Sequence, residues 1–322
     1  MGWLCGMKHR AGSRRGWCCE RGAVWSGSGL SAVGGTLLRR ILDQHPDISC
    51  PPEPWLTTAC ARFLQDVPTD TIPIGVRAGL GFSGIAEAEV TAALREVLFR
   101  FHGQMADGKP VWVEKSGFDV FHLQTLAELL AGHGKFICML RHPLDVIASN
   151  LDLAQRMGRF LPEMQPWLTR FASPVEALAE AWADRTVAML DFVAGREDTV
   201  LYRFEDLLAH PEATLDPIFD LLGVARMKLA DVAAALSAPT RPGLGDWKTL
   251  GEAGLNPAPV GRWQKVISRR VAGGLMARLA PVMRRAGYEP LPVPNMPSRA
   301  EAIRQFGAAA RLADQTGADQ TG

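Results

Sequence analysis

The sequence has no C-x-x-C pair, no cluster of histidines at zinc spacing, no long apolar run and almost no net charge. The six cysteines, at positions 5, 18, 19, 50, 60 and 138, fit neither a metal site nor an ordinary disulfide framework. We therefore expect a reducing, cytoplasmic location. Apolar runs fall short of the roughly 18 residues that a membrane helix needs, so no membrane span is expected. A net charge of +1 argues against a nucleic-acid-binding coat, so any anion site must be local.

The first 25 residues differ from the rest of the chain. They contain three of the nine tryptophans and three of the six cysteines, without helical or strand periodicity. We interpret residues 1–25 as an atypical leader, either disordered or derived from a misassigned start. The main domain is expected over 26–296, followed by a C-terminal helix and a frayed tail over 297–322.

Short apolar runs alternate with longer helical patterns in the remainder of the chain. This alternation is typical of an α/β fold with a central parallel sheet. The predicted strands are 23–25, 111–114, 135–140 and 199–202. The predicted helices are 34–44, 55–66, 86–104, 118–131, 143–156, 174–195, 211–222, 228–237 and 268–286. The Gly/Pro-rich stretch 238–262 is expected to be a long functional loop.

A Gly/Ser-rich run leads into the first predicted helix, as in loops that cradle phosphate. Residues 27–32 also satisfy G-x-G-x-x-A after a weak strand, the pattern of a dinucleotide site. That fingerprint needs an acidic residue closing a second strand about 20 residues later. Here this distance falls in the loop-like HPDISCPPEP, so the dinucleotide interpretation is weak. The G-K-[ST] element of P-loop NTPases is absent.

Charged residues follow the ends of two predicted strands. Arg141 comes directly after strand 135–140, and Ser149 lies about two turns into the next helix. A guanidinium at that edge of a parallel sheet can bind a phosphate, although Arg141 could instead pair with Asp145. Lys115 ends strand 111–114, where it can reach a ligand or remain solvated.

Two Trp–cation pairs, Trp247–Lys248 and Arg262–Trp263, lie in or just after the 238–262 loop. Such pairs can pack a purine and hold its phosphates, or anchor the loop in the core. The acidic residues after Phe204 can simply cap a helix.

The order of these segments resembles a known family. The run GGTLLRRILDQHPDISC, the strand-Arg-x-Pro-x₅-Ser motif, the FEDL…HPE…LGV segment and VGRW…MARLAPVMRRAGYEP are together similar to sulfotransferases that use 3′-phosphoadenosine 5′-phosphosulfate (PAPS). The closest subgroup is bacterial proteins similar to tyrosylprotein sulfotransferases. The resemblance covers roughly residues 30 to 292 and implies a P-loop-like three-layer sandwich, with PAPS as co-substrate and a hydroxyl-bearing small molecule or peptide as acceptor.

The resemblance also implies roles for individual residues. Glu53, on a proline-flanked loop, falls at the general base of the tyrosylprotein branch, and Lys115 at its catalytic lysine. Phe204 replaces the family's usual tyrosine near the nucleotide, so stacking is kept and a hydroxyl contact is lost. The remaining implied cofactor-binding residues are Gly34, Gly35, Thr36 and Leu37 for the 5′-phosphosulfate, Arg141 and Ser149 for the 3′-phosphate, and Gly261, Arg262 and Trp263 as a closing segment.

The phosphosulfate loop departs from the family pattern. Ala32 and Val33 stand where the family has arginine and serine. This departure favours an alternative, a nucleotide-binding homologue with weak or no transfer activity. Arg39 and Arg40 lie one turn too far into the helix to substitute. The acceptor is not defined by the sequence, and a homodimer is one expectation for the assembly.

Overall fold

The structure is a computed structural model that describes residues 21–27, 35–238, 260–292 and 295–306. Five strands form one sheet in the order β2-β3-β1-β4-β5, and every pairing is parallel. This confirms the predicted α/β class with a central parallel sheet. The strands are β1 (Arg21–Gly27), β2 (Ile48–Ser49), β3 (Val111–Ser116), β4 (Gly134–Leu140) and β5 (Thr199–Arg203).

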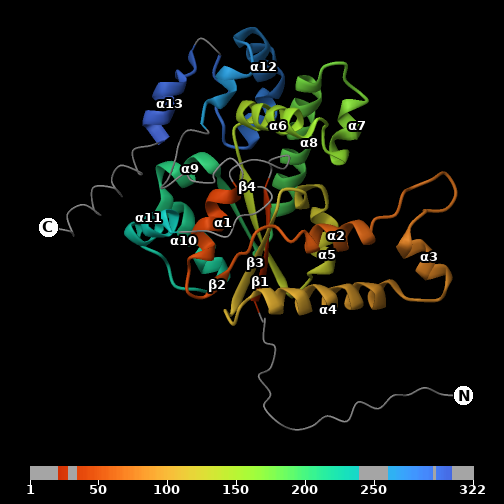
Figure 1. The fold of residues 1–322 in the computed structure, drawn as a ribbon. Helices are drawn as coiled ribbons and strands as arrows, with labels where there is room; N and C mark the ends of the chain where they lie inside the picture. Colours follow the sequence, from red (N-terminus) through yellow and green to blue (C-terminus); the bar gives the residue numbers. More distant parts are fainter. Residues whose placement is uncertain (1–20, 28–34, 239–259, 293–294, 307–322) are drawn as a thin grey trace, which may run out of the picture.

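Helices cover both faces of the sheet (Figure 1). One face packs against α1 (Gly35–Asp43), α9 (Phe204–Ala209), α10 (Pro211–Leu222) and α11 (Leu229–Ser237). The other packs against α2 (Leu56–Phe63), α4 (Glu87–Met105), α5 (Leu123–Leu129), α6 (Pro143–Met157), α8 (Pro174–Val193) and α12 (Arg269–Arg285). Shorter elements are α3 (Val76–Phe82), α7 (Gln165–Leu168), α13 (Arg299–Phe306) and the 3₁₀ turns η1 (Asp119–Phe121), η2 (Pro162–Met164) and η4 (Arg262–Lys265).

Strand β4 explains how two cores form around one sheet. Successive strand side chains point to opposite faces. Phe136 and Cys138 pack in the core beneath α5 and α8, whereas Ile137 and Met139 pack in the core beneath α1 and α10. An apolar strand buried on both sides is expected at the centre of a parallel sheet covered by helices.

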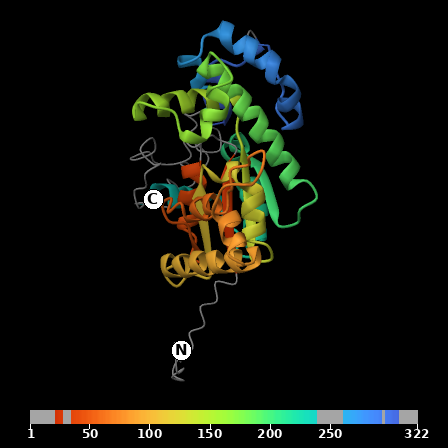
Figure 2. The same ribbon diagram turned by 90° about the vertical axis from the view of Figure 1, so that its right-hand side faces the viewer.

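The sheet order places a topological switch beside β1. After β1 the chain builds β2 and β3 on one side, and then returns to build β4 and β5 on the other. Ligands of open α/β sheets bind beyond the carboxyl ends of the strands at such a point. Figures 1 and 2 both show α12 and α13 at the upper end of the molecule and α4 across its lower end.

Several element boundaries differ from the sequence prediction. Strand β1 begins at Arg21, so the expected domain boundary at residue 25 falls inside a central strand. The single helix expected over 118–131 is divided into η1 and α5, because His122 has a non-helical backbone. Residues 239–259 and 307–322 lie outside the described residues. Among the described residues, no helix is long and apolar enough to cross a membrane.

Candidate functional site

The two predicted catalytic residues are in direct contact. Lys115 lies next to the carboxyl end of β3, and Glu53 lies in the loop between β2 and α2. Lys115 Nζ and Glu53 Oε1 form an ion pair, and the two side chains are 12% and 11% exposed. A carboxylate and an ammonium are therefore held together at the edge where ligands of parallel sheets bind.

A buried carboxylate fixes the backbone that follows Glu53. Glu114 Oε1 accepts hydrogen bonds from Thr57 N at 3.1 Å and Thr57 Oγ1 at 2.9 Å. Its other oxygen lies 2.5 Å from His102 Nε2, and the His102 ring stacks on Trp112. Because the N-terminal N–H groups of a helix lack intrahelical partners, Glu114 satisfies one that α2 leaves open.

A second buried carboxyl group extends this network. Asp119 accepts hydrogen bonds from Thr57 Oγ1 at 3.1 Å and Thr58 Oγ1 at 2.7 Å, and Thr58 also contacts Ser116 Oγ at 2.8 Å. Burial, and then the nearby Glu114 carboxylate, raise the pKa of Asp119 well above its ordinary value. We call this set the β3 network: Thr57, Thr58, His102, Glu114, Ser116 and Asp119.

The β3 network and the ion pair join the same two segments from opposite sides. Glu114 and Ser116 flank Lys115 in β3, and alternate strand residues face opposite sides of the sheet. Thr57 follows Glu53 by only four residues. The separation of Glu53 and Lys115 is therefore constrained by buried hydrogen bonds as well as by their own contact.

Arg141, the predicted phosphate ligand, lies directly beyond β4 and is only 4% exposed. Its guanidinium carbon lies 4.6 Å from the centre of the Phe204 ring. Burial lowers the pKa of Arg141, while Asp145 and Glu205 oppose this shift. Phe204 is 2% exposed and packs in the core, so its ring serves as a support for Arg141 and is not an exposed stacking surface.

Asp145 connects α6 to the predicted closing segment. Its carboxylate accepts hydrogen bonds from Gly261 N at 2.8 Å and Trp263 N at 3.0 Å. Arg262 Nη2 donates to Asp152 Oδ2, also on α6, at 3.0 Å. The Trp263 side chain is 3% exposed and lies in the core, so it anchors the segment. The segment 261–263 is thus attached to the helix that follows Arg141.

Glu205 performs a similar task at the start of α9. It accepts hydrogen bonds from His142 N at 2.9 Å and from Tyr288 Oη at 2.8 Å. Burial raises the pKa of Glu205, although the His142 N–H and Arg141 oppose the shift. We call this set the β4 network: His142, Asp145, Glu205, Gly261, Trp263 and Tyr288.

Helix α1 begins at Gly35, with Thr36 buried and Leu37 half-buried in its first turn. This turn has no acidic residue, so the positive end of the helix dipole is not neutralised locally. Gly34 lies outside the described residues. Ser149 is 5% exposed on α6. Arg40 donates to Leu236 O, as expected of a residue that faces away from the ligand edge.

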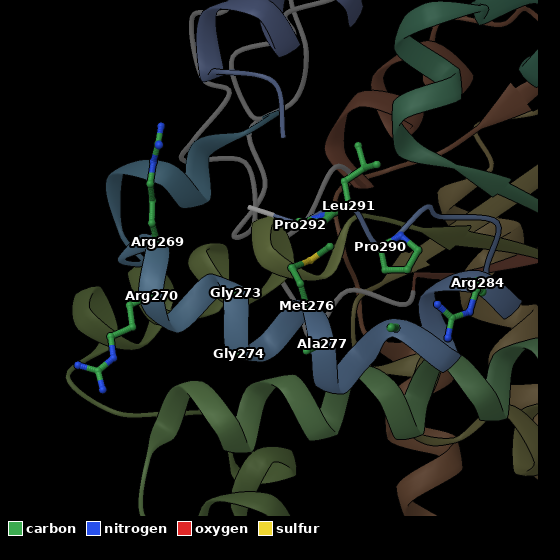
Figure 3. Close-up of a pocket in the computed structure, with 11 residues that line it drawn as sticks. Arg269, Arg270, Gly273, Gly274, Met276, Ala277, Arg284, Pro290, Leu291 and Pro292 are labelled. Carbon is green, nitrogen blue, oxygen red and sulfur yellow. The ribbon is translucent and has the colours of Figure 1, made fainter. Parts of the chain in front are cut away.

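Two hollows lie beyond these residues. A cavity of about 580 Å³ is lined by Gly261, Trp263 and four members of the β4 network, His142, Asp145, Glu205 and Tyr288, but by neither Arg141 nor Glu53. A groove of about 670 Å³ runs along α12, with Arg269, Arg270 and Arg284 at its rim and Met276 on its floor (Figure 3). None of the predicted site residues lines this groove.

Sequence reasoning missed the residues that support the site. Thr57, His102 and Asp119 stand within apolar helical patterns, where nothing in the sequence distinguishes them from surface polar residues. Asp145 was expected only as a partner for Arg141, and the structure shows its carboxylate bound to backbone N–H groups. Tyr288 lies in the AGYEP segment of the resemblance, which gave it no role.

Comparisons with known proteins agree with this arrangement. The model of the family described as "Sulfotransferase family" matches residues 29–228, more than half of the chain. The nodulation protein NoeE of Sinorhizobium fredii (strain NBRC 101917 / NGR234) is 28% identical over 208 residues, which cover 61% of this chain and 48% of NoeE. The chain therefore matches about half the length of this relative.

Two solved structures have a similar fold. The sulfotransferase domain from the curacin biosynthetic pathway has a TM-score of 0.56 at 18% identity, over 84% of this chain and 98% of that domain. The sulfotransferase domain from the Synechococcus PCC 7002 olefin synthase has a TM-score of 0.57 at 20% identity, over 83% and 95%. At these identities the likeness concerns the fold alone. With the family match over residues 29–228, the chain belongs to the sulfotransferase family.

Proposed function

We propose that this protein transfers a sulfuryl group from PAPS to a hydroxyl acceptor, with Glu53 as general base and Lys115 as the cation at the reacting centre. The observation that carries the proposal is the Glu53–Lys115 ion pair at the ligand-binding edge of the sheet. The donor supplies the sulfuryl group and a bisphosphate leaving group. Transfer is an in-line displacement by analogy with phosphoryl transfer, so positioning and charge stabilisation dominate.

Glu53 takes the proton of the acceptor hydroxyl as the oxygen attacks. Such general-base catalysis contributes about 10²- to 10⁴-fold in rate. Lys115 stabilises negative charge that develops near the transferred group. The ion pair keeps Glu53 ionised and aimed, and the buried contacts of Thr57 hold its loop in place.

The residues expected to hold the nucleotide suit an anion. The first turn of α1 offers backbone N–H groups with no acidic side chain beside them. Arg141 is a buried guanidinium whose neighbouring carboxylates, Asp145 and Glu205, already accept hydrogen bonds from other groups. We propose that Thr36, Arg141 and Ser149 bind the phosphates and that segment 261–263 borders them.

A second function, nucleotide binding without efficient transfer, is favoured by Ala32 and Val33 in place of the family's arginine and serine. The missing cation would help to neutralise the sulfuryl group. Loss of such a contact costs about 10²-fold or more in rate. Binding of adenosine 3′,5′-bisphosphate without transfer to any acceptor in a broad screen supports this alternative.

The decisive experiment combines a titration with a transfer assay. The protein is expected to bind adenosine 3′,5′-bisphosphate in preference to NAD and ATP, by calorimetry. Glu53→Gln is expected to reduce transfer from labelled donor at least about 100-fold while bisphosphate affinity stays within threefold. Glu128→Gln, an exposed carboxylate on α5, is the matched control. Unchanged turnover in Glu53→Gln would remove Glu53 as the base.

A further inference from the structure

Trp55 follows the Glu53 loop in a backbone conformation that tryptophan rarely adopts. Its φ of 59° and ψ of 23° lie in the left-handed region. Among the non-glycine residues that the structure describes, only Asp107 shares a positive φ. A bulky residue in this region is strained, and such strain persists where the surroundings fix the backbone and is often linked to function. Here the buried bonds of Thr57 and Thr58 fix the chain directly after Trp55.

The indole of Trp55 forms part of an aromatic surface. It is 38% exposed and meets the Phe118 ring edge to face, with centroids 5.4 Å apart and planes at 80°. The guanidinium carbon of Arg62 lies 5.5 Å from the centre of the Phe118 ring, and Arg62 forms an ion pair with Glu163. Phe118 is therefore braced by a cation, and Trp55 presents a large apolar face to solvent. We call Trp55 and Phe118 the aromatic wall.

This wall stands beside the second oxygen of Glu53. Oε1 pairs with Lys115, whereas Oε2 receives the Trp55 indole N–H at 3.4 Å. That distance is long for an N–H···O bond, so the contact is weak and Oε2 can still accept a hydroxyl proton. A hydroxyl within hydrogen-bond reach of Oε2 brings the atoms that carry it against the indole.

We propose that the aromatic wall is the acceptor-binding surface and that it selects a hydroxyl carried by a rigid ring. The inference rests on the proposed role of Glu53 and adds the class of acceptor. A flat ring, whether the π face of a phenol or the C–H face of a pyranose, can cover the indole while its hydroxyl reaches Oε2. An open-chain alcohol covers less of the indole and loses rotational freedom on binding, so it gains less from the wall.

The test compares three probes, 4-nitrophenol, methyl β-D-glucopyranoside and 1,4-butanediol, with wild type, Trp55→Phe and Trp55→Ala. Transfer kinetics with labelled donor are measured, together with probe binding by saturation-transfer NMR in the presence of adenosine 3′,5′-bisphosphate. Trp55→Ala is expected to raise KM for a ring acceptor about tenfold with kcat within threefold, and to leave butanediol unchanged. Trp55→Phe is expected to restore most of the KM. The ring probe that responds identifies a phenol or a sugar as the source of the ring.

Two further variants separate binding from folding. Trp55→Gly removes the indole at a backbone conformation that glycine adopts freely, so it is expected to fold and to lose ring binding. Phe82→Ala removes an aromatic side chain that is 75% exposed on α3 and is the matched control. Ring-probe NMR signals that are equal in wild type and Trp55→Ala would overturn the inference. Trp55-dependent ring binding without transfer supports the wall and defeats the proposed reaction.

Discussion

The β3 network and the β4 network each bury two carboxyl groups beside a segment of the candidate site, but with different counter-charges. In the β4 network, Asp145 and Glu205 lie close enough to Arg141 to influence its pKa. In the β3 network, Glu114 and Asp119 influence each other, and the nitrogen within hydrogen-bond reach of Glu114 is that of His102. The same task of positioning is thus performed with a guanidinium in one case and without one in the other.

This difference determines where protons are held. Two buried carboxylates that lack a strong cation cannot both ionise at low cost. The pKa of Asp119 is accordingly raised well above its ordinary value, whereas the His142 N–H and Arg141 limit the rise for Glu205. The β3 network is therefore a fixed scaffold that retains a proton, and the β4 network keeps a cation at the edge where we propose phosphate binding.

Removing Glu114 is expected to have the largest effect on stability. Glu114→Ala leaves the Thr57 N–H and the His102 imidazole buried without their shared acceptor. Loss of one partner from a buried charged pair costs about 3–5 kcal/mol. Urea unfolding is expected to give a decrease of this size, and transfer activity is expected to fall as the Glu53 loop loosens. Thr57→Ser, which keeps the hydroxyl, is the control; a loss below 1 kcal/mol for Glu114→Ala would contradict the scaffold role.

A smaller and more local effect is expected in the β4 network. Asp145→Asn keeps the shape of the side chain but turns an amide N–H₂ toward one of the two backbone N–H groups of Gly261 and Trp263. Loss of one charge-assisted hydrogen bond costs about 1.5–3 kcal/mol. Hydrogen exchange is expected to accelerate at residues 261–267 while β4 stays protected, and bisphosphate affinity is expected to fall about tenfold. Exchange that rises equally throughout the sheet would contradict a local role for Asp145.

The two networks also differ in how far the sequence predicts them. Hydrophobic alternation predicts β3, β4 and β5, because a buried parallel strand must be apolar on both faces. The resemblance brings Glu53 and Lys115 forward, and the structure places them in contact. Thr57 and Asp119 could not be identified in the same way, because their burial depends on how α2 packs against β3, and polar residues of that kind usually lie on the surface.

The interpretation of Phe204 and Trp263 as nucleotide contacts illustrates the same limit. Both stand where the family pattern predicts a ligand, and both side chains are buried, one beneath Arg141 and one in the core. An aromatic residue beside a cation has the same sequence pattern whether it supports a binding residue or contacts the ligand. The backbone of segment 261–263, held by Asp145, remains beside α6 as proposed.

The smallest expected effect is a difference in pH dependence between the networks. Because the folded state holds the Asp119 proton above the ordinary pKa of 3.8, it binds more protons than the unfolded state, and stability falls as pH rises toward the raised pKa. Asp119→Asn abolishes this contribution, which is at most about 1.4 kcal/mol per pH unit. Glu205→Gln is expected to flatten a narrower window above 4.5, because Arg141 limits the shift. Urea unfolding at half-unit intervals from pH 4 to 9 measures both slopes, and an equal or larger change in Glu205→Gln would show that the missing guanidinium is not what distinguishes the β3 network.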